Sequence, residues 1–182
     1  MDMQLRDPAS RRTEPIQPLD VLVLLKLISA GGTSLSVRKL AEALGGVSKS
    51  AVEVALQRLK AHSLLRESEG DRQINRLVTR ELLEKGIKWI APAVVGGFEL
   101  GLATAHAGPP LADKLRGDSD PMVIPIAEGP VRGRAVTPLH PAAPGAARSD
   151  PKLHDLLSLV DALRVGGARD REIAMAELRN RI

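Results

Sequence analysis

The residues whose types and spacing point to a chemistry lie on a candidate helix over residues 48–60. Lys49 can reach a phosphate or a guanine edge, and Ser50 and Gln57 can bond base edges. Val54 has the size and apolar character to contact a thymine methyl group. These side chains therefore predict contacts with the edges and the backbone of a DNA duplex.

A helical wheel supports this interpretation of residues 48–60. At about 100° per residue, the apolar side is formed by Ala51, Val52, Ala55, Leu56 and Leu59. The other side carries Lys49, Ser50, Glu53, Val54, Gln57 and Lys60. Glu53 either accepts a hydrogen bond from a cytosine amine or repels phosphate. A helix that packs by one face and presents short polar groups near its start is what a major-groove reader requires.

Two more helices are predicted upstream of this one. Apolar residues at helical spacing favour a helix from Pro18 to Ala30, which the following glycines stop. Ser36 is a suitable N-cap for a second helix, which Gly45 and Gly46 end in a tight turn. Ser48 then caps the third helix, so the order is helix, turn, helix.

Residues 64–79 predict a hairpin that follows the third helix. Gly70 and Asp71 are a turn signal between two short extended segments. Arg72 and Arg76 are expected on this wing, over residues 66–76, facing a minor groove or phosphates. The alternative is a solvent-exposed hairpin without a partner. The residues expected to contact DNA are Arg38, Ser48, Lys49, Ser50, Glu53, Val54, Gln57, Lys60, Arg72 and Arg76.

A fourth helix is predicted from Arg80 to Ile90, and Trp89 on it is expected in the core or at an interface between subunits. Residues 91–151 then hold 10 of the 13 prolines and 8 of the 16 glycines, which break every candidate helix. We expect an extended arm here that packs either on the protein's own core or on another protein.

The last 32 residues predict a helical hairpin. Asp150 and Pro151 are an N-cap followed by a first-turn proline. The first helix carries a wide apolar stripe of Leu153, Leu156, Leu157, Val160 and Leu163. This stripe either covers the protein's own domain or forms a surface for a dimer or a partner.

Composition excludes several classes of protein. The chain has no cysteine, which rules out disulfides and thiolate metal sites. With one Trp, one Phe and no Tyr, it lacks the aromatic platforms of single-strand and RNA binders. Residues 1–90 hold 15 Lys and Arg against 11 Asp and Glu, so they carry the whole net charge of +4. We expect no membrane span and no secretory signal, and a soluble cytoplasmic protein.

No residues suggest catalysis or a bound cofactor. The histidines at 62, 106, 140 and 154 lack partners at metal-ligand spacing. The glycines at 96, 97 and 101 lack the context of a nucleotide-binding loop, and no serine or carboxylate lies in a nucleophile motif. We therefore expect neither an enzyme nor a metal site.

Residues 19–78 resemble the winged-helix DNA-binding domain of small prokaryotic transcription regulators, with the MarR and ArsR types nearest. The resemblance lies in the segments 36–44, 47–52 and 56–60, followed by Leu64 and Leu65 entering the wing. It implies major-groove binding by residues 48–60 and wing contacts near 66–76. The cysteines of arsenical-repressor metal sites are absent, and the second half matches no ligand domain.

The expected fold is mainly α with a small β wing. It comprises a disordered arm at 1–17, a winged helix-turn-helix at 18–90, an extended segment at 91–150 and a helical hairpin at 151–182. The expected function is a sequence-specific double-stranded DNA-binding regulator acting as a homodimer, a repressor or autoregulator. The alternative is an antitoxin-type or other interaction module whose residues 91–182 bind a partner protein such as a toxin, by analogy of architecture.

Overall fold

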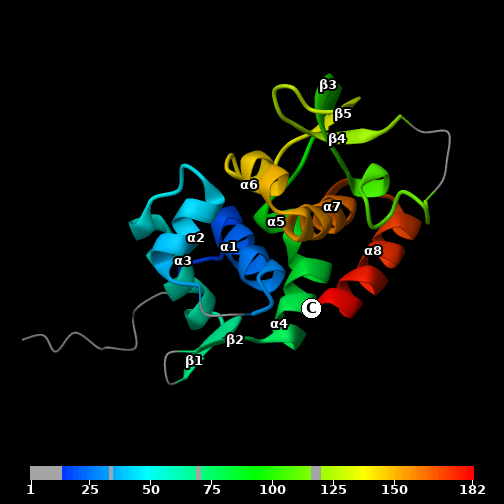
Figure 1. Ribbon diagram of the computed structural model, residues 1–182. Helices are drawn as coiled ribbons and strands as arrows, with labels where there is room; N and C mark the ends of the chain where they lie inside the picture. The colour runs from blue at the N-terminus through cyan, green and yellow to red at the C-terminus, as the bar shows by residue number, and fades with distance from the viewer. Residues whose placement is uncertain (1–13, 33–34, 69–70, 116–119) are drawn as a thin grey trace, which may run out of the picture.

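A computed structural model describes residues 14–32, 35–68, 71–115 and 120–182 (Figure 1). Within these residues the chain is a mixed α/β protein in which helices predominate. Most of the arm expected at 1–17 lies outside the described residues. Helices of the described residues are all too short or too polar to cross a membrane.

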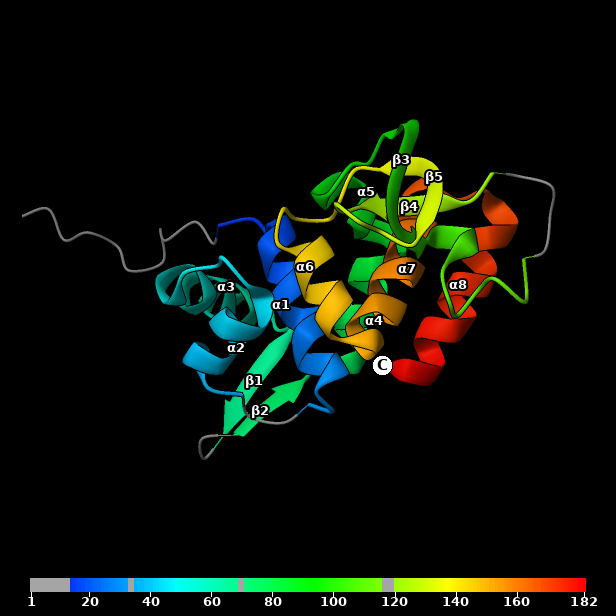
Figure 2. The same cartoon turned by 45° about the horizontal axis from the view of Figure 1, so that its top comes forward.

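The first half follows the expected order of elements. α1 (Pro18–Ser29), α2 (Val37–Leu44) and α3 (Lys49–Ala61) are followed by β1 (Leu65–Ser68) and β2 (Asp71–Ile74). The two strands pair antiparallel, and residues 69 and 70 of the predicted turn lie outside the described residues. In Figure 2 this hairpin projects beside α2 and α3.

The helix after the hairpin begins earlier than predicted. It comprises α4 (Arg76–Glu81), a π-helical turn (Leu82–Gly86) and α5 (Ile87–Ile90). Asn75 is its N-cap, because its Oδ1 accepts a hydrogen bond from the Val78 amide at 3.3 Å. Side-chain capping by Asn75 therefore places the start four residues before the expected Arg80.

The described residues between 91 and 150 include a sheet and a helix, so the expectation of an extended arm is wrong. β3 (Val95–Thr104) pairs antiparallel with β4 (Met122–Pro125) and with β5 (Val131–Val136). β4 and β5 pair parallel to each other, so each of the three strands pairs with the other two. The three strands therefore form a small closed sheet. α6 (Ala143–Ser149) follows the sheet.

The glycines and prolines of this segment suit a tightly closed sheet. A Cβ at Gly101 would lie 2.3 Å from the Ile124 carbonyl oxygen, and one at Gly133 would lie 2.4 Å from that of Pro121. Both positions therefore require the absence of a side chain. Pro125 ends β4, and Pro121 directly precedes it, at positions where a missing N–H is tolerated.

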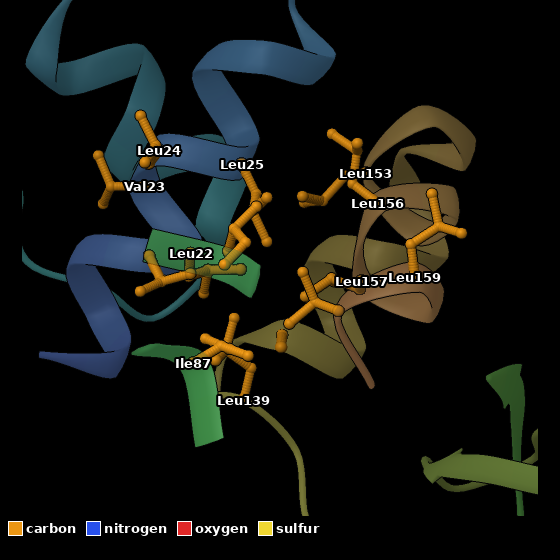
Figure 3. Packing of buried hydrophobic residues seen from close by; sticks show 14 of the residues in the cluster. Leu22, Val23, Leu24, Leu25, Ile87, Leu139, Leu153, Leu156, Leu157 and Leu159 are labelled. Carbon is orange, nitrogen blue, oxygen red and sulfur yellow. The ribbon is translucent and has the colours of Figure 1, made fainter. Parts of the chain in front are cut away.

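The C-terminal helical hairpin forms as expected, but it packs inward. α7 (Pro151–Val165) lies against α1, α5, α6, β3 and α8 (Ala168–Arg181). Figure 3 shows Leu25 of α1 facing Leu153 and Leu156 of α7. One continuous cluster of buried apolar residues runs from α1 to α8, so the two halves of the chain share a core.

A buried ion pair ties α7 to the sheet. The side chains of Asp161 and Arg164 are 2% and 1% exposed. Arg164 Nη1 donates to Asp161 Oδ1 at 2.7 Å, and the Thr104 hydroxyl donates to Asp161 Oδ2 at 2.7 Å. Arg164 Nε donates to the Ala91 carbonyl oxygen at 2.7 Å, directly after α5. Burial raises the pKa of Asp161, against the opposing effect of Arg164 and Thr104.

The start of α7 is joined to the end of α1 by Asp150. Its Oδ1 caps α7 by accepting from the Leu153 amide at 3.1 Å. Its Oδ2 accepts from Lys26 Nζ at 2.6 Å and from the Ser29 hydroxyl at 2.8 Å. Burial works to raise the pKa of Asp150, but these hydrogen bonds outweigh it and hold that pKa below its usual value.

Candidate nucleic-acid interface

The turn before α3 has the local structure that the sequence predicts. Gly45 and Gly46 have φ of 53° and 77°, in the region that glycine adopts without strain. The Ser48 hydroxyl then caps α3 by accepting from the Ala51 amide at 3.2 Å. Val47, between the glycines and the cap, is half-buried and packs against the core.

α3 has one buried face and one exposed face, which confirms the packing side expected from the helical wheel. The buried residues are Val52, Ala55, Leu56 and Leu59. The exposed residues are Lys49, Ser50, Glu53, Val54, Gln57 and Lys60. Val54 is 42% exposed although it is apolar. The exposed side chains can contact a partner without disturbing the core.

Arg58 fixes the direction of α3. Its Nε and Nη2 donate to Asp20 Oδ2 and Oδ1 at 2.7 and 2.8 Å, a bidentate pair with a carboxylate that is fully buried. Arg58 also pairs with Glu14 at 3.2 Å, and the hydrogen bonds to Asp20 raise the pKa of Arg58. The pair joins α3 to the first turn of α1, so the exposed face keeps a fixed orientation.

Sequence reasoning assigned no role to Arg58 or Asp20. The available signal is Asp20, an isolated carboxylate in the otherwise apolar run 18–25. Asp20 Oδ2 also accepts a hydrogen bond from the Gln17 amide at 2.8 Å, as in a capping box. A charge that lies among core residues needs a partner, and Arg58 is the partner here.

The arginine that the hairpin exposes is Arg66, whereas Arg72 and Arg76 were expected there. Leu65 is buried and its neighbour Arg66 is exposed, directly across from Gln73 on β2. Arg66 was missing from the predicted contact residues. The period-two alternation from buried Leu65 identifies it, because successive strand side chains point to opposite faces.

Arg72 was predicted to point from the wing toward DNA, but the structure turns its side chain inward. Its side chain is 14% exposed and lies 3.9 Å from Glu67. Its Nη1 donates to the Leu35 carbonyl oxygen, at the start of α2. Arg72 therefore holds the hairpin against the helices, because β2 turns this residue inward.

The remaining predicted basic residues lie in different surroundings. Arg76 is exposed, but it begins α4 and so lies outside the hairpin, contrary to the prediction. Arg38 is exposed on α2 beside Glu42 at 3.5 Å, a solvent-screened pair. Lys60 pairs with Glu67 across α3 and β1 and lowers the pKa of that carboxyl group.

The apolar stripe of the C-terminal hairpin is not a surface. Its side chains are at most 3% exposed because α1, α5, α6 and α8 surround α7; they are Leu153, Leu156, Leu157, Val160 and Leu163. Of the two interpretations left open, the structure therefore favours the one in which the stripe covers its own domain.

Trp89 is the predicted interface residue that remains accessible. It is 85% exposed on α5, so it is not a core residue. Val94, a few residues later, is 71% exposed. Two large apolar side chains thus lie at the surface in one short segment.

No group of three or more His, Asp or Glu side chains that could hold a metal ion occurs among the described residues. His154 Nε2 lies 2.7 Å from the Ala103 carbonyl oxygen, and His62 Nε2 lies 2.8 Å from that of Glu14, so both rings bridge elements of the fold.

Comparison of the chain with models of known protein families, with curated proteins and with solved structures gives no match.

Proposed function

We propose that the protein is a sequence-specific double-stranded DNA-binding regulator of transcription, built on a winged helix-turn-helix. α3 enters the major groove with Lys49, Ser50, Val54 and Gln57, and the β1–β2 hairpin lies on the flanking groove or backbone. The observation that carries the proposal is the exposed polar face of α3, capped by a serine and free of core packing.

The rigid mounting of α3 supports this proposal. A reading helix must be held in one orientation, because base contacts depend on its angle in the groove. The pair between Arg58 and buried Asp20 supplies that constraint, and it uses the inner side of α3. Arg66, exposed on the hairpin beside α3, is well placed for a phosphate contact.

We further propose that the regulator acts in the cytoplasm as a homodimer that represses transcription, its own gene included. Exposed Trp89 supports the dimer, because buried tryptophans dominate many interfaces. Substitution of Trp89 by Ala is expected to convert the dimer to a monomer in sedimentation velocity. A wild-type protein that sediments as a monomer at DNA-binding concentrations contradicts the dimer.

The direct test is fluorescence anisotropy with duplex DNA from upstream of the gene and with a scrambled duplex, at several salt concentrations. A preference of roughly a thousandfold or more for the upstream duplex supports a specific regulator. Equal, salt-sensitive binding to both duplexes would mean that a basic patch binds DNA without sequence specificity. An absence of binding at low salt rejects it.

Single substitutions test the assigned face. Lys49→Ala is expected to weaken binding and to reduce the salt slope by about one, whereas Gln57→Ala should weaken binding roughly fivefold with the slope unchanged. Lys88→Ala on α5 is the matched control, because it removes an exposed lysine away from this face. Equal effects of Lys49→Ala and Lys88→Ala would show that the face is misassigned.

A second candidate is a module that binds a partner protein, such as an antitoxin-type regulator. Exposed Trp89 and Val94 favour it, whereas the stripe that first suggested it is buried. A partner that protects Trp89 from quenching by acrylamide would support this function.

A further inference from the structure

A hollow of about 390 Å³ lies where the hairpin, the end of α1 and the end of α8 meet. Its lining residues come from segments far apart in the sequence and include Ile28, Ile74, Ile182, Arg72, Arg76 and Arg181. A second hollow of about 210 Å³ shares Ile28, Gly31 and Arg181 with the first and continues toward the start of α7. The two hollows therefore adjoin.

The charges around these hollows are mostly positive. Lys152 joins the three arginines of the first hollow, and Asp155 is the one acidic side chain among the described residues that line either hollow. Ile182 also lines the first hollow, and its backbone oxygen accepts a hydrogen bond from Arg80. Glu67 lies 3.9 Å from Arg72, and Glu177 pairs with Arg181. Even with these two flanking carboxylates the cations remain in excess, so an anion is attracted.

The arginines differ in how firmly they are held. Arg72 donates to the Leu35 carbonyl oxygen, which fixes it in the wall. Arg76 is exposed at the first position of α4, and Arg181 is one-third exposed on the last turn of α8. Each guanidinium group presents a planar fork of donors that matches a carboxylate or a phosphate.

Apolar side chains form the rest of the wall. Ile28 and Ile74 are partly buried and Ile182 is 3% exposed. A ligand with a hydrocarbon part can cover them, whereas a bare inorganic anion cannot. The volume falls in the range of small-molecule sites.

We propose that this hollow binds a small organic anion. The carboxylate or phosphate group is held between Arg76 and Arg181, and the hydrocarbon part lies against Ile28 and Ile74. The lining from α1 and α8 lies outside the exposed face of α3. Arg72, Gln73 and Ile74 belong to the hairpin that the proposed function lays on DNA, so the ligand is tested in the absence of DNA.

The test is an NMR titration of the full chain, without DNA and in a low-chloride buffer, with hexanoate and with inorganic phosphate. Saturable shifts of the Gly31 and Ile74 amides are expected. Arg181→Gln and Arg76→Gln should each weaken the better probe about tenfold, the effect of losing one charge-assisted hydrogen bond. Arg132→Gln is the matched control and should leave the affinity unchanged, because it removes an exposed arginine of β5 that lies over Phe98 of β3, away from the hollow.

The two probes identify the chemistry. Tighter binding of hexanoate supports a carboxylate with an apolar body, and tighter binding of phosphate supports a phosphorylated ligand. Shifts that stay linear with both probes, or an equal loss in Arg132→Gln, overturn the site. Thermal unfolding gives a second readout, because a ligand that binds the folded state raises the Tm of the wild type and raises it less in Arg181→Gln. Circular dichroism shows whether each variant is folded.

Discussion

α3 and α7 are capped helices of similar length, 13 and 15 residues, in opposite environments. α3 packs by one face on α1, α2 and β1 and leaves the other to solvent, whereas α7 is buried without interruption from Leu156 to Arg164. Polar residues on the outer face of α3, such as Lys49, Ser50 and Gln57, are therefore available to a partner. The buried polar residues of α7, Ser158, Asp161 and Arg164, bond to the protein itself. The exposure of a polar side chain depends on what surrounds the helix.

The largest effect is expected from the ion pair inside α7. Arg164→Leu leaves the carboxylate of Asp161 buried without its guanidinium partner and should destabilise the fold by about 4 kcal/mol. Lys60→Leu on α3 breaks a solvent-screened surface pair with Glu67 and should leave stability nearly unchanged. Urea unfolding measures both. Similar losses would remove the contrast between the two helices.

A smaller effect is expected from apolar truncation. Leu157→Ala removes a side chain that is 1% exposed and should cost about 3 kcal/mol, because a cavity remains in the core. Val54→Ala on the outer face of α3 should stay within about 0.5 kcal/mol. Thermal or urea unfolding checks the pair. A large loss at Val54 would mean that the α3 face is covered.

The N-cap side chains of α3 and α7 are expected to contribute different amounts to stability. Ser48→Ala removes one acceptor for a backbone amide and should destabilise by about 1 kcal/mol. Asp150→Ala also removes the bonds from Lys26 and Ser29 and should destabilise by about 2 kcal/mol. Unfolding in urea at neutral pH gives the order. The reverse order would show that the link between α1 and α7 contributes little.

The smallest effect is the share of the pH dependence that Asp150 contributes at the start of α7. Because the pKa of Asp150 in the folded protein is below its ordinary value of 3.8, its contribution is present above that value. The contribution is lost as the pH falls through the lower, folded-state pKa. Asp150→Asn keeps the cap but should flatten the fall in stability below about pH 4. Ser48→Ala, measured by urea unfolding across the same range, should leave that fall unchanged.

Helical periodicity predicted which face of α3 is exposed, but it did not predict that the polar residues of α7 are buried. In α3 the polar residues other than Arg58 face solvent, so the pattern gives the helix and its free face but not the ion pair of Arg58 with Asp20. In α7 the polar residues Ser158, Asp161 and Arg164 resemble a solvated face, yet they are buried and bond to α7, to Thr104 and to the backbone near α5. Neighbours that lie far away in the chain decide this difference, and a local pattern does not contain them.

The same limit explains the other errors. Prolines and glycines correctly excluded long helices from most of residues 91–150, but their use in a closed sheet depends on contacts such as Gly101 with Ile124. The hairpin was predicted, whereas Arg72 was assigned to the outer face and Arg66 was left out, because the alternation was not followed from buried Leu65. The anion-binding hollow brings together α1, β2 and α8, which sequence spacing does not connect.

The position of α1 has a practical consequence. It packs against α3 on one side and against α7 on the other, and its residues from Asp20 to Leu25 are all buried. A fragment that ends near residue 90 would expose Leu25 where Leu153 and Leu156 now cover it. The first ninety residues are therefore not expected to fold as an independent domain that can be fused to another protein. The roles of individual residues have to be tested by point substitution in the whole chain.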